Sequence, residues 1–423
     1  MHPGYGFLAE RAEFAEAVAG AGLQFVGPPA RAIRAMGEKT AARRLMAGAG
    51  VPIVPGTTEP VEDAEAAVRQ AEAIGYPVML KAAAGGGGRG MRRANSASEV
   101  RELFRQASSE ARSAFGDGSL YLEKLIERPR HVEVQILADQ YGAVTHVGER
   151  ECSIQRRHQK LIEEAPSPAV SPALRQAMGE AAMQAARSVG YQSAGTVEFL
   201  LAPSGEFYFL EMNTRIQVEH PVTELVYGVD LVRQQLRIAA GQALAFHRPP
   251  APRGHAIECR LTSEDPLQGF LPSTGRVEFL RVPAGPGVRW DGGIEAGTEV
   301  SLYYDPLLAK LIVWGETRDE ALRRMARALD ELIVVGVRTS QPLHRRVLAD
   351  PEFRSGEYDV SYLERSGARL LETAADPAEL ELLAVAVALA AAAVQRPTAA
   401  GDAMRAAAGA SGWLYAARRD ALR

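Results

Sequence analysis

The chain has 423 residues, is 47% hydrophobic and 24% charged, and carries a formal net charge of −4 at pH 7. Such a composition is typical of a globular protein with room for two or three domains, and the charge argues against a nucleic-acid partner. The only cysteines are Cys152 and Cys259, which argues against a disulfide framework. We expect a cytoplasmic protein with neither a signal peptide nor a membrane partner.

The elements expected in chain order indicate an α/β or α+β protein of several lobes. The loop "HPGYG" is followed by helices at 8–21 and 29–50, separated by a strand "LQFVG". A helix at 63–74 and another at 96–115 flank a strand, a glycine loop and a second strand. "LYLEKLI" and "RHVEVQILAD" are strands, and "AVTHVGERECSIQRRHQKLIEEAP" is a strand passing into a charged loop. A helix at 171–189, a hairpin, short strands at 254–314, helices at 317–332 and 339–348 and an Ala-rich segment at 366–423 complete the order, with Asp376 and Pro377 beginning a new helix.

Lysine is rare in this chain. Of 48 basic residues, five are lysines, namely Lys39, Lys81, Lys124, Lys160 and Lys310. A chain that uses arginine as its ordinary cation suggests that a retained lysine serves where a compact ammonium is needed. We interpret Lys310 as the accidental exception.

The stretch "LKAAAGGGGRGMR" predicts a phosphate-covering lid. Consecutive glycines, Gly85 to Gly88, let backbone N–H groups turn toward phosphate oxygens without a Cβ in the way. The lysine precedes the glycines, so this is not a Walker A loop. A flexible surface loop is the alternative, and Lys81 and Arg89 at either side favour the lid.

The hairpin "AGTVEFLLAPSGEFYFLEMN" predicts a pair of facing carboxylates. If it turns at Ser204 and Gly205, Glu198 faces Glu211, and the neighbouring pair on that face is Leu200 with Phe209. Two such carboxylates repel each other unless a proton or a cation lies between them. Oxygen ligands in a phosphate-binding protein favour Mg²⁺ or Mn²⁺.

The next stretch, "EMNTRIQVEH", predicts an active-site wall. If it is extended, every second side chain lies on one side, namely Glu211, Asn213, Arg215, Gln217 and Glu219. Asn213 can complete the metal shell, Arg215 can hold a small oxyanion and Glu219 can act as a base. "SIQRRHQK" adds a basic cluster around Lys160, which we interpret as anion-binding although such a run is often only a solvated surface.

Together these segments resemble the biotin carboxylases of the ATP-grasp superfamily, from His2 to about Glu364. The motifs are "HPGYGFL", "GGGGRGM", "RHVEVQILAD", "QRRHQKLIEEAP", "NTRIQVEHPVTE", "HAIECRL", "FLPSTG", "GVRWD" and "YYDPLLAKLIVWG". The resemblance implies an ATP-grasp fold with a glycine lid and a C-terminal biotin carboxylase lobe. It divides the chain into a remnant of an N-terminal nucleotide-fold domain (1–36), an ATP-grasp domain (37–250, lid about 54–125), the C-terminal domain (251–365) and the start of a linker or biotin-transfer region (366–423).

The resemblance also implies a role for each matching residue. ATP would be bound by Lys39, Lys81, Gly85, Gly86, Gly87, Gly88, Glu123, Lys124, Leu125, His131, Gln155 and His158. The metal ligands would be Glu198, Glu211 and Asn213. Bicarbonate would lie at Lys160, Arg215, Gln217 and Val218 with Glu219 as base, and biotin at Tyr5 and Arg289, the latter steadying charge on the ureido oxygen.

The implied reaction is the ATP-dependent carboxylation of carrier-borne biotin by bicarbonate through carboxyphosphate. The cofactors would be ATP, Mg²⁺ or Mn²⁺ and biotin. The partners would be a second copy of the chain, a biotin carboxyl carrier protein or domain, and a carboxyltransferase subunit. The enzyme would belong to an acetyl-, propionyl- or methylcrotonyl-CoA carboxylase.

The resemblance has two gaps. The family has further strands before "HPGYG" and a biotinyl-lysine domain with the signature "AMKM", and neither is in this sequence. We therefore expect a chain truncated before Met1, with an exposed sheet edge there. Two alternatives stay open: another ATP-grasp ligase, or a non-catalytic remnant that acts only in assembly.

Overall fold

The computed structural model describes residues 1–57, 59–83, 91–246, 248, 250–372, 381–382 and 384–389. The chain divides into two compact units, Met1–Leu371 and Glu372–Arg423. In the second unit, residues 381–382 and 384–389 are helical, whereas Asp376 and Pro377, predicted to begin that helix, lie outside the described residues. Within the described ranges, no helix combines the length and apolar character needed to cross a bilayer.

The first unit contains both helices and strands, as predicted. The helices are α1 (Ala12–Gly20), α2 (Ala30–Gly37), α3 (Lys39–Gly48), α4 (Ala64–Ile74), α5 (Ala97–Phe115), α6 (Pro172–Ser188), α7 (His220–Tyr227), α8 (Leu231–Ala239), η1 (Pro266–Gln268), α9 (Arg318–Glu331), α10 (Gln341–Ala349), α11 (Pro351–Ser355) and α12 (Tyr362–Leu371). The strands are β1 (Val78–Ala82), β2 (Arg92–Ala94), β3 (Leu120–Lys124), β4 (Arg130–Ala138), β5 (Val144–Arg156), β6 (Gln159–Ala165), β7 (Ser193–Leu201), β8 (Phe207–Asn213), β9 (His255–Thr262), β10 (Glu264–Asp265), β11 (Leu271–Pro272), β12 (Gly275–Arg276), β13 (Phe279–Arg281), β14 (Val288–Gly292), β15 (Glu299–Val300), β16 (Leu307–Gly315) and β17 (Ile333–Val335).

Three local predictions were wrong. The segment "LQFVG" is not a strand; the N–H of Val26 donates to the carbonyl of Met1 at 2.8 Å, but no longer ladder forms there. The helix expected over 29–50 is two helices, because Glu38 has an extended backbone (φ −97°, ψ 113°). The charged loop expected after β5 is a short turn that leads directly into β6.

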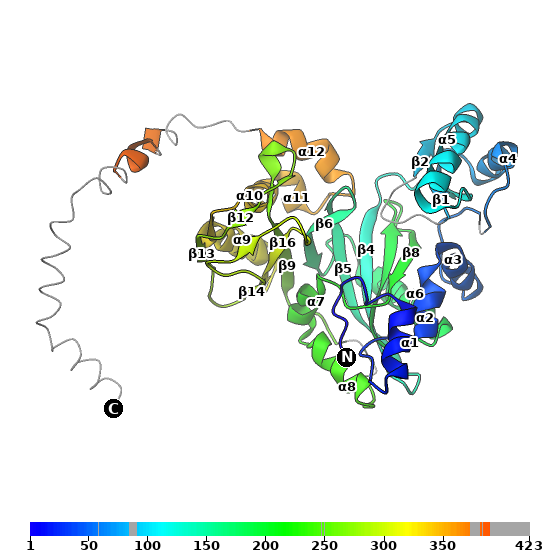
Figure 1. The fold of residues 1–423 in the computed structure, drawn as a ribbon, viewed down its shortest axis with the longest axis horizontal. Helices are drawn as coiled ribbons and strands as arrows, with labels where there is room; N and C mark the ends of the chain where they lie inside the picture. Colours follow the sequence, from blue (N-terminus) through cyan, green and yellow to red (C-terminus); the bar gives the residue numbers. More distant parts are fainter. Residues whose placement is uncertain are drawn as a thin grey trace, which may run out of the picture. The chain divides into compact units, whose positions relative to one another are not determined.

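The largest sheet has eight antiparallel strands in the order β14-β16-β9-β6-β5-β4-β7-β8. Figure 1 shows β6, β5 and β4 side by side in it. α6 packs on one face of β4 and β5 through an apolar cluster that includes Met178, Ala182 and Val134. α9 packs on β9 and β16 through Leu322 and Met325.

α7 packs against four neighbouring strands of the same sheet, namely β5, β6, β9 and β16. Val222 and Val226 anchor it in an apolar cluster with Leu137 and Ile312. β4 alternates between its two faces, so Val134 contacts the α6 cluster while Glu133 points to the opposite side. Glu133 therefore lies on the face of the sheet opposite to α6.

A smaller sheet, β2-β1-β3, packs against α4 and α5 with its own apolar core, which includes Val68, Leu80, Phe104 and Leu122. Figure 1 shows β1, β2, α4 and α5 gathered in one group. The side chains of Asp63 and Ser96 cap the two helices by accepting from backbone N–H groups three residues on. In the sequence, Gly85 to Gly88 fall between β1 and β2 of this group.

Candidate active site

The hairpin of β7 and β8 places Glu198 directly opposite Glu211, as the sequence predicted. Next to this pair the register shifts by one residue, so Leu200 faces Tyr208 rather than Phe209. A bulge adds a residue to one strand, and the predicted register assumed regular pairing. Glu198 is only 4% exposed, so water does not screen its charge and a cation is needed close by.

Charged side chains lie in a row across the large sheet, on the face that α7 covers. The directly opposed pairs are Asp291 with Lys310, Lys310 with Arg260, Arg150 with Glu133, Glu133 with Glu198, and Glu198 with Glu211. We call this set, together with Lys160 of β6, the charged row. It brings together residues that are far apart in the sequence, because the order of the strands in the sheet differs from their order in the chain.

Lys160 lies at the centre of the charged row. Its Nζ donates to Glu133 Oε2 at 2.6 Å, to Glu219 Oε1 at 2.7 Å and to Glu198 Oε1 at 2.9 Å. Burial alone would lower the pKa of Lys160, but the three carboxylates outweigh burial and hold it well above its ordinary value. The ammonium is therefore charged and joins three strands and the turn before α7.

A bulge explains how Lys160 reaches this face. Ile154 pairs with Ile162, yet the next residue on β5, Gln155, pairs with Lys160. β6 therefore contains one extra residue at this point, which resets the alternation of its side chains. As a result Lys160 lies on the same side as Glu163, three positions along, which a regular strand would not allow.

Glu219, the predicted base, immediately precedes α7 and is fully buried. Besides Lys160, it accepts a hydrogen bond from Arg260 at 2.8 Å through Oε2. Burial would raise the pKa of Glu219, but Lys160, Arg260 and Arg150 lower it well below its ordinary value. Glu219 is thus an ionised carboxylate held between two cations.

Arg150 is the largest fully buried side chain that the structure describes. Its guanidinium donates to Glu133 at 2.5 Å, to Gln135 at 2.7 Å, to Thr223 of α7 at 3.0 Å and to Thr196 of β7 at 3.1 Å. These contacts fasten α7 to the sheet beneath it. Arg150 therefore fixes the helix that Glu219 immediately precedes.

The extended segment predicted after Glu211 was wrong. β8 ends at Asn213, and the chain then bends until α7 begins at His220. Arg215 nevertheless donates to Gln217 at 2.9 Å and to Asn213 at 3.2 Å, and its Nε lies 3.1 Å from Glu10. The predicted residues are thus brought together by side-chain contacts of a bent segment and not by strand alternation.

Lys310 is not accidental, contrary to the sequence interpretation. Its side chain is buried, and Nζ donates to the backbone carbonyl of Val218 at 2.7 Å. Asp291 lies 3.5 Å from the same nitrogen. Lys310 therefore fixes the turn between Gln217 and Glu219, where the bicarbonate contacts were predicted.

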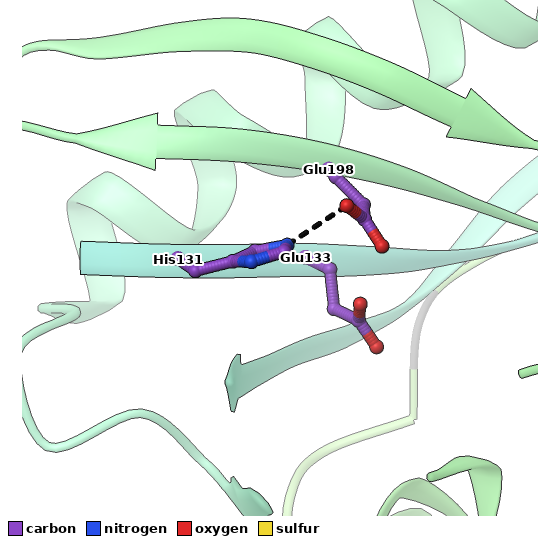
Figure 2. Close-up of side chains that lie close together, drawn as sticks. All are labelled: His131, Glu133 and Glu198. Carbon is purple, nitrogen blue, oxygen red and sulfur yellow. Dashed lines mark ion pairs between the residues drawn. The ribbon is translucent and has the colours of Figure 1, made fainter. Parts of the chain in front are cut away.

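Figure 2 shows His131, Glu133 and Glu198, three buried groups whose ligand atoms lie within 4.8 Å of one another. His131 Nε2 forms an ion pair with Glu198 at 2.9 Å, although its geometry is not that of an aligned hydrogen bond. Burial opposes protonation of His131, but Glu198 outweighs it, and the pKa is raised. Lys160 donates to both glutamates, so its ammonium already balances part of the negative charge of this cluster.

The predicted metal ligands, Glu198, Glu211 and Asn213, have donor atoms that suit a divalent metal ion. All three offer oxygen, the donor that Mg²⁺ and Mn²⁺ prefer. The two carboxylates face each other, and Asn213 Nδ2 donates to Glu198 at 2.9 Å. The opposed pair offers the negative charge that a divalent ion between the strands would neutralise.

On the nucleotide side, Glu123 joins two cations. Its carboxylate is 4% exposed and forms ion pairs with Lys81 and with Arg43 of α3. Lys124 instead donates to the backbone carbonyls of Tyr76 at 2.7 Å and Gly75 at 3.0 Å. The side chain of Lys124 thus binds within its own lobe.

The rest of the predicted ATP-binding set is placed less fully. The N–H of Leu125 donates to the carbonyl of Pro77 at 3.0 Å, and Lys39 is the first residue of α3. Gly85, Gly86, Gly87 and Gly88 lie outside the described residues. Gln155 lies near the end of β5, half-buried, and His158 is exposed in the β5–β6 turn with φ 66°.

The predicted basic cluster splits in two. Lys160 points into the charged row, whereas Arg156 lies over the ring of Phe270 with its guanidinium carbon 4.0 Å from the ring centroid. Arg157 and His158 are both exposed in the turn. A single anion site formed by all four cations is therefore wrong, because a two-residue turn sends its side chains in different directions.

The two residues predicted for biotin, Tyr5 and Arg289, lie on separate elements. Tyr5 is 44% exposed in the N-terminal loop. Arg289 of β14 binds Asp291 with two hydrogen bonds of 2.8 Å and Glu224 of α7 with one of 2.7 Å. His220, Glu224 and Arg289 border a cavity of about 520 Å³.

Sequence reasoning missed five charged residues of this region: Glu133, Arg150, Glu163, Glu258 and Arg260. Arg150 and Glu163 stand next to other charged residues, in "GERE" and "IEEA", whereas Glu133, Glu258 and Arg260 lie in strands where polar and apolar residues alternate, "RHVEVQ" and "IECRL". That pattern usually indicates one face in water. Here α7 covers the face, and Glu133, Arg150, Glu163 and Glu258 are 0% exposed.

Three family models match the chain. The biotin carboxylase N-terminal domain matches residues 1–33, the ATP-binding domain of the carbamoyl-phosphate synthase L chain matches 38–247, and the biotin carboxylase C-terminal domain matches 258–365. A biotin carboxylase of Nostoc sp. is 53% identical over 365 residues, covering 86% of this chain and 82% of the relative. A biotin carboxylase of Haemophilus influenzae is 50% identical over 367 residues, covering 86% and 82%.

Solved structures agree. The biotin carboxylase domain dimer of Hydrogenobacter thermophilus 2-oxoglutarate carboxylase, in complex with MgADP, ADP and bicarbonate, has a TM-score of 0.83 and 48% identity, covering 88% of this chain and 82% of that one. The biotin carboxylase of Campylobacter jejuni has a TM-score of 0.82 and 46% identity, covering 86% and 81%. These identities are high enough to carry the relationship beyond the fold.

Proposed function

This chain belongs to the biotin carboxylase family, and we propose that the charged row beneath α7 is the site at which it carboxylates biotin. The reaction uses ATP and bicarbonate, and biotin arrives on a carrier. The observation that carries the proposal is the arrangement around Glu219, where a buried carboxylate lies between Lys160 and Arg260. Such a group can accept a proton in a site from which water is excluded.

Glu219 is the general base toward bicarbonate in this proposal. In the structure its pKa is too low for an efficient base, because Lys160, Arg260 and Arg150 stabilise its charge. A bicarbonate anion bound by Arg215 and Lys160 would share the ammonium of Lys160 with Glu219. Glu219 would then lose part of that stabilisation, and its pKa would rise toward the range in which a base is effective.

The phosphate end of the site is formed by the hairpin and the small lobe. We propose that Glu198, Glu211 and Asn213 hold Mg²⁺ or Mn²⁺, which supplies charge stabilisation on the nucleotide phosphates when bound. Lys81 and Lys39 would bind phosphate oxygens, and Glu123, Lys124 and Leu125 would border the adenine. His131, Gln155, His158 and the glycine lid, Gly85 to Gly88, complete the proposed ATP set.

We revise the proposed partner of the biotin ureido oxygen from Arg289 to Arg260. The resemblance pointed to Arg289, but all three of its hydrogen bonds go to Glu224 and Asp291. Arg260 contacts Glu219 directly and is held from behind by Glu163 at 2.6 Å. A cation that stabilises the enolate of biotin must lie beside the group that handles the proton. Tyr5, Gln217 and Val218 remain the other proposed contacts of biotin and bicarbonate.

Replacing each arginine by lysine separates the two assignments. Arg260→Lys keeps a charge but cannot bridge two carboxylates in the same plane, so we expect roughly a 100-fold fall in biotin carboxylation. Arg289→Lys, the matched change, is expected to lower the rate by less than about tenfold. The measurement is biotin carboxylation with free biotin. A larger loss in Arg289→Lys than in Arg260→Lys would restore the first assignment.

The proposed function itself is tested by ATP hydrolysis of this chain with bicarbonate and free biotin, each also omitted in turn. Hydrolysis that requires bicarbonate, together with labelled carboxybiotin from labelled bicarbonate, is the expected result. ATP hydrolysis that proceeds with a different acid acceptor would favour another ATP-grasp ligase. Binding of a carrier without any hydrolysis would favour an assembly role.

We also propose that the chain is divided into the domains predicted from the sequence. We expect it to form a homodimer like that of the Hydrogenobacter domain. Its two further proposed partners are a biotin carboxyl carrier protein or domain and a carboxyltransferase subunit. Cys152 and Cys259 are both free thiols, which agrees with the cytoplasm as the proposed location. The acyl-CoA substrate belongs to the carboxyltransferase and not to this site.

A further inference from the structure

Two buried carboxyl groups beneath α7 have no role in the reaction described above. Glu163 of β6 and Glu258 of β9 lie directly opposite each other, and both are 0% exposed. Directly opposed residues of an antiparallel pair have Cβ atoms about 4.5–5.5 Å apart. Two glutamate side chains at such positions can bring their carboxyl groups close enough to share one proton.

The hydrogen bonding of this pair is incomplete. Among the described residues, neither carboxyl oxygen of Glu258 has a hydrogen-bond partner, and Oε2 of Glu163 has none. Oε1 of Glu163 accepts from Arg260 Nε at 2.6 Å. An ionised carboxylate without partners is costly to bury, and a group so placed takes up a proton instead. Glu258 is therefore the neutral member of the pair.

The electrostatic surroundings give the same order. The charged and titratable groups that face the pair are Arg260 of β9, Lys310 of β16, Lys160 of β6, Cys152 of β5 and Glu219 before α7. Burial raises the pKa of Glu258 well above its ordinary value despite Lys310. Burial also raises the pKa of Glu163, to about 7, against the opposing effect of Arg260.

We propose that Glu163 and Glu258 hold a proton between them and thereby position Arg260 for the carboxylation of biotin. With Glu258 neutral and Glu163 ionised, Arg260 has one carboxylate behind it and Glu219 in front. If both carried a proton, Arg260 would lose the anion behind it and turn toward Glu219. If both were ionised, the doubled negative charge would draw Arg260 away from Glu219.

The proposal rests on the role assigned to Arg260 above, and it makes Glu163 and Glu258 positioning residues. Its first consequence is spectroscopic. The wild-type enzyme at mildly alkaline pH should show the infrared carbonyl stretch of a protonated buried carboxylic acid. Glu258→Gln should remove this band. A wild-type spectrum without such a band, or a band that survives in Glu258→Gln, overturns the proposal.

Glu164 supplies the matched control for the infrared measurement. It is the next residue of β6, is 1% exposed, and binds Arg318 at 2.7 and 3.0 Å and His255 at 2.5 Å. Burial would raise its pKa, but these partners lower it to about 2. Glu164 is thus a buried carboxylate that carries no proton, and Glu164→Gln should leave the band unchanged.

The second consequence is kinetic. Glu163→Gln removes the charge behind Arg260, so we expect biotin carboxylation to fall roughly 10- to 100-fold. Bicarbonate-dependent ATP hydrolysis measured without biotin should fall much less, which a general loss of structure would not produce. The wild-type rate should decline below pH about 7, as Glu163 takes up its proton, and Glu163→Gln should lack this step.

The outcomes separate this proposal from the proposed function. If the wild-type chain carboxylates biotin but Glu163→Gln does so equally well, the positioning role is overturned while the function stands. If the wild-type chain has no activity, the proposed function fails, and the kinetic role of the pair fails with it. The infrared comparison still decides in that case whether the pair holds a proton.

Discussion

Glu219→Gln should abolish the bicarbonate- and biotin-dependent hydrolysis of ATP, with a fall of roughly 100- to 10,000-fold. Glutamine keeps the shape of the side chain but cannot accept the proton of bicarbonate. The change also removes a negative charge from between Lys160 and Arg260, whose nitrogens lie 2.7 and 2.8 Å from its oxygens. Steady-state release of ADP, with and without bicarbonate, measures the effect.

Binding of MgADP must be retained in Glu219→Gln for this result to report on catalysis, because Glu219 is not among the proposed ATP contacts. Glu206→Gln, in the exposed turn of the β7–β8 hairpin, is the matched control and should behave as wild type. If Glu219→Gln kept more than about a tenth of the activity, another group would be the base. The first candidate to test would then be Glu133 of β4, another buried carboxylate that Lys160 contacts.

The sequence predicted those parts of the site that depend on local pairing. Glu198 and Glu211 face each other as the hairpin predicted, but regular pairing from the turn does not account for this by itself. Next to the turn Leu200 pairs with Tyr208, one residue away from the predicted register, and a bulge between that pair and Glu198 restores the predicted pairing. A bulge changes the face of every later side chain, and nothing in "EFLLAPSGEFYFLE" indicates one.

The sequence did not predict the parts that depend on the order of strands. Lys160 contacts Glu133 because β6, β5 and β4 are neighbours, and Arg260 contacts Glu219 because β9 lies next to β6 under α7. These partners are separated by 27 and 41 residues. Alternating charges in a strand indicate only that one face is polar, and a covering helix decides whether that face is a surface or a site.

The rarity of lysine indicated residues with specific contacts, and this holds also for Lys310, which we had interpreted as accidental. Lys81 and Lys160 both form ion pairs with buried carboxylates, and Lys124 donates to two carbonyls. Lys310 donates to the backbone carbonyl of Val218. Lys124, Lys160 and Lys310 each place a small ammonium with three donors beside more than one acceptor, and the planar guanidinium of arginine fits such a space poorly.

Arg150→Met should destabilise the first unit by about 3–5 kcal/mol, the loss expected when one partner of a buried ion pair is removed. Arg150 is 0% exposed, and its guanidinium joins Glu133, Gln135, Thr196 and Thr223. In the variant, Glu133 keeps its ion pair with Lys160 but loses the one with Arg150. Gln135, Thr196 and Thr223 lose the hydrogen bonds that Arg150 donates. The loss in free energy of unfolding is measured from the shift of the urea midpoint between wild type and variant.

Arg101→Met is the matched control for this measurement. Arg101 binds Glu65 with two hydrogen bonds of 2.7 and 2.9 Å, a geometry as good as that of Arg150, but the two side chains are 44% and 59% exposed. An exposed pair contributes about 0–1 kcal/mol, so this change should be nearly silent. The double variant Glu133→Gln with Arg150→Met should be less destabilised than the sum of the two single changes, because the uncompensated carboxylate is then gone. Additive losses would show that Arg150 stabilises the unit through α7 and the threonines, with little contribution from the charge of Glu133.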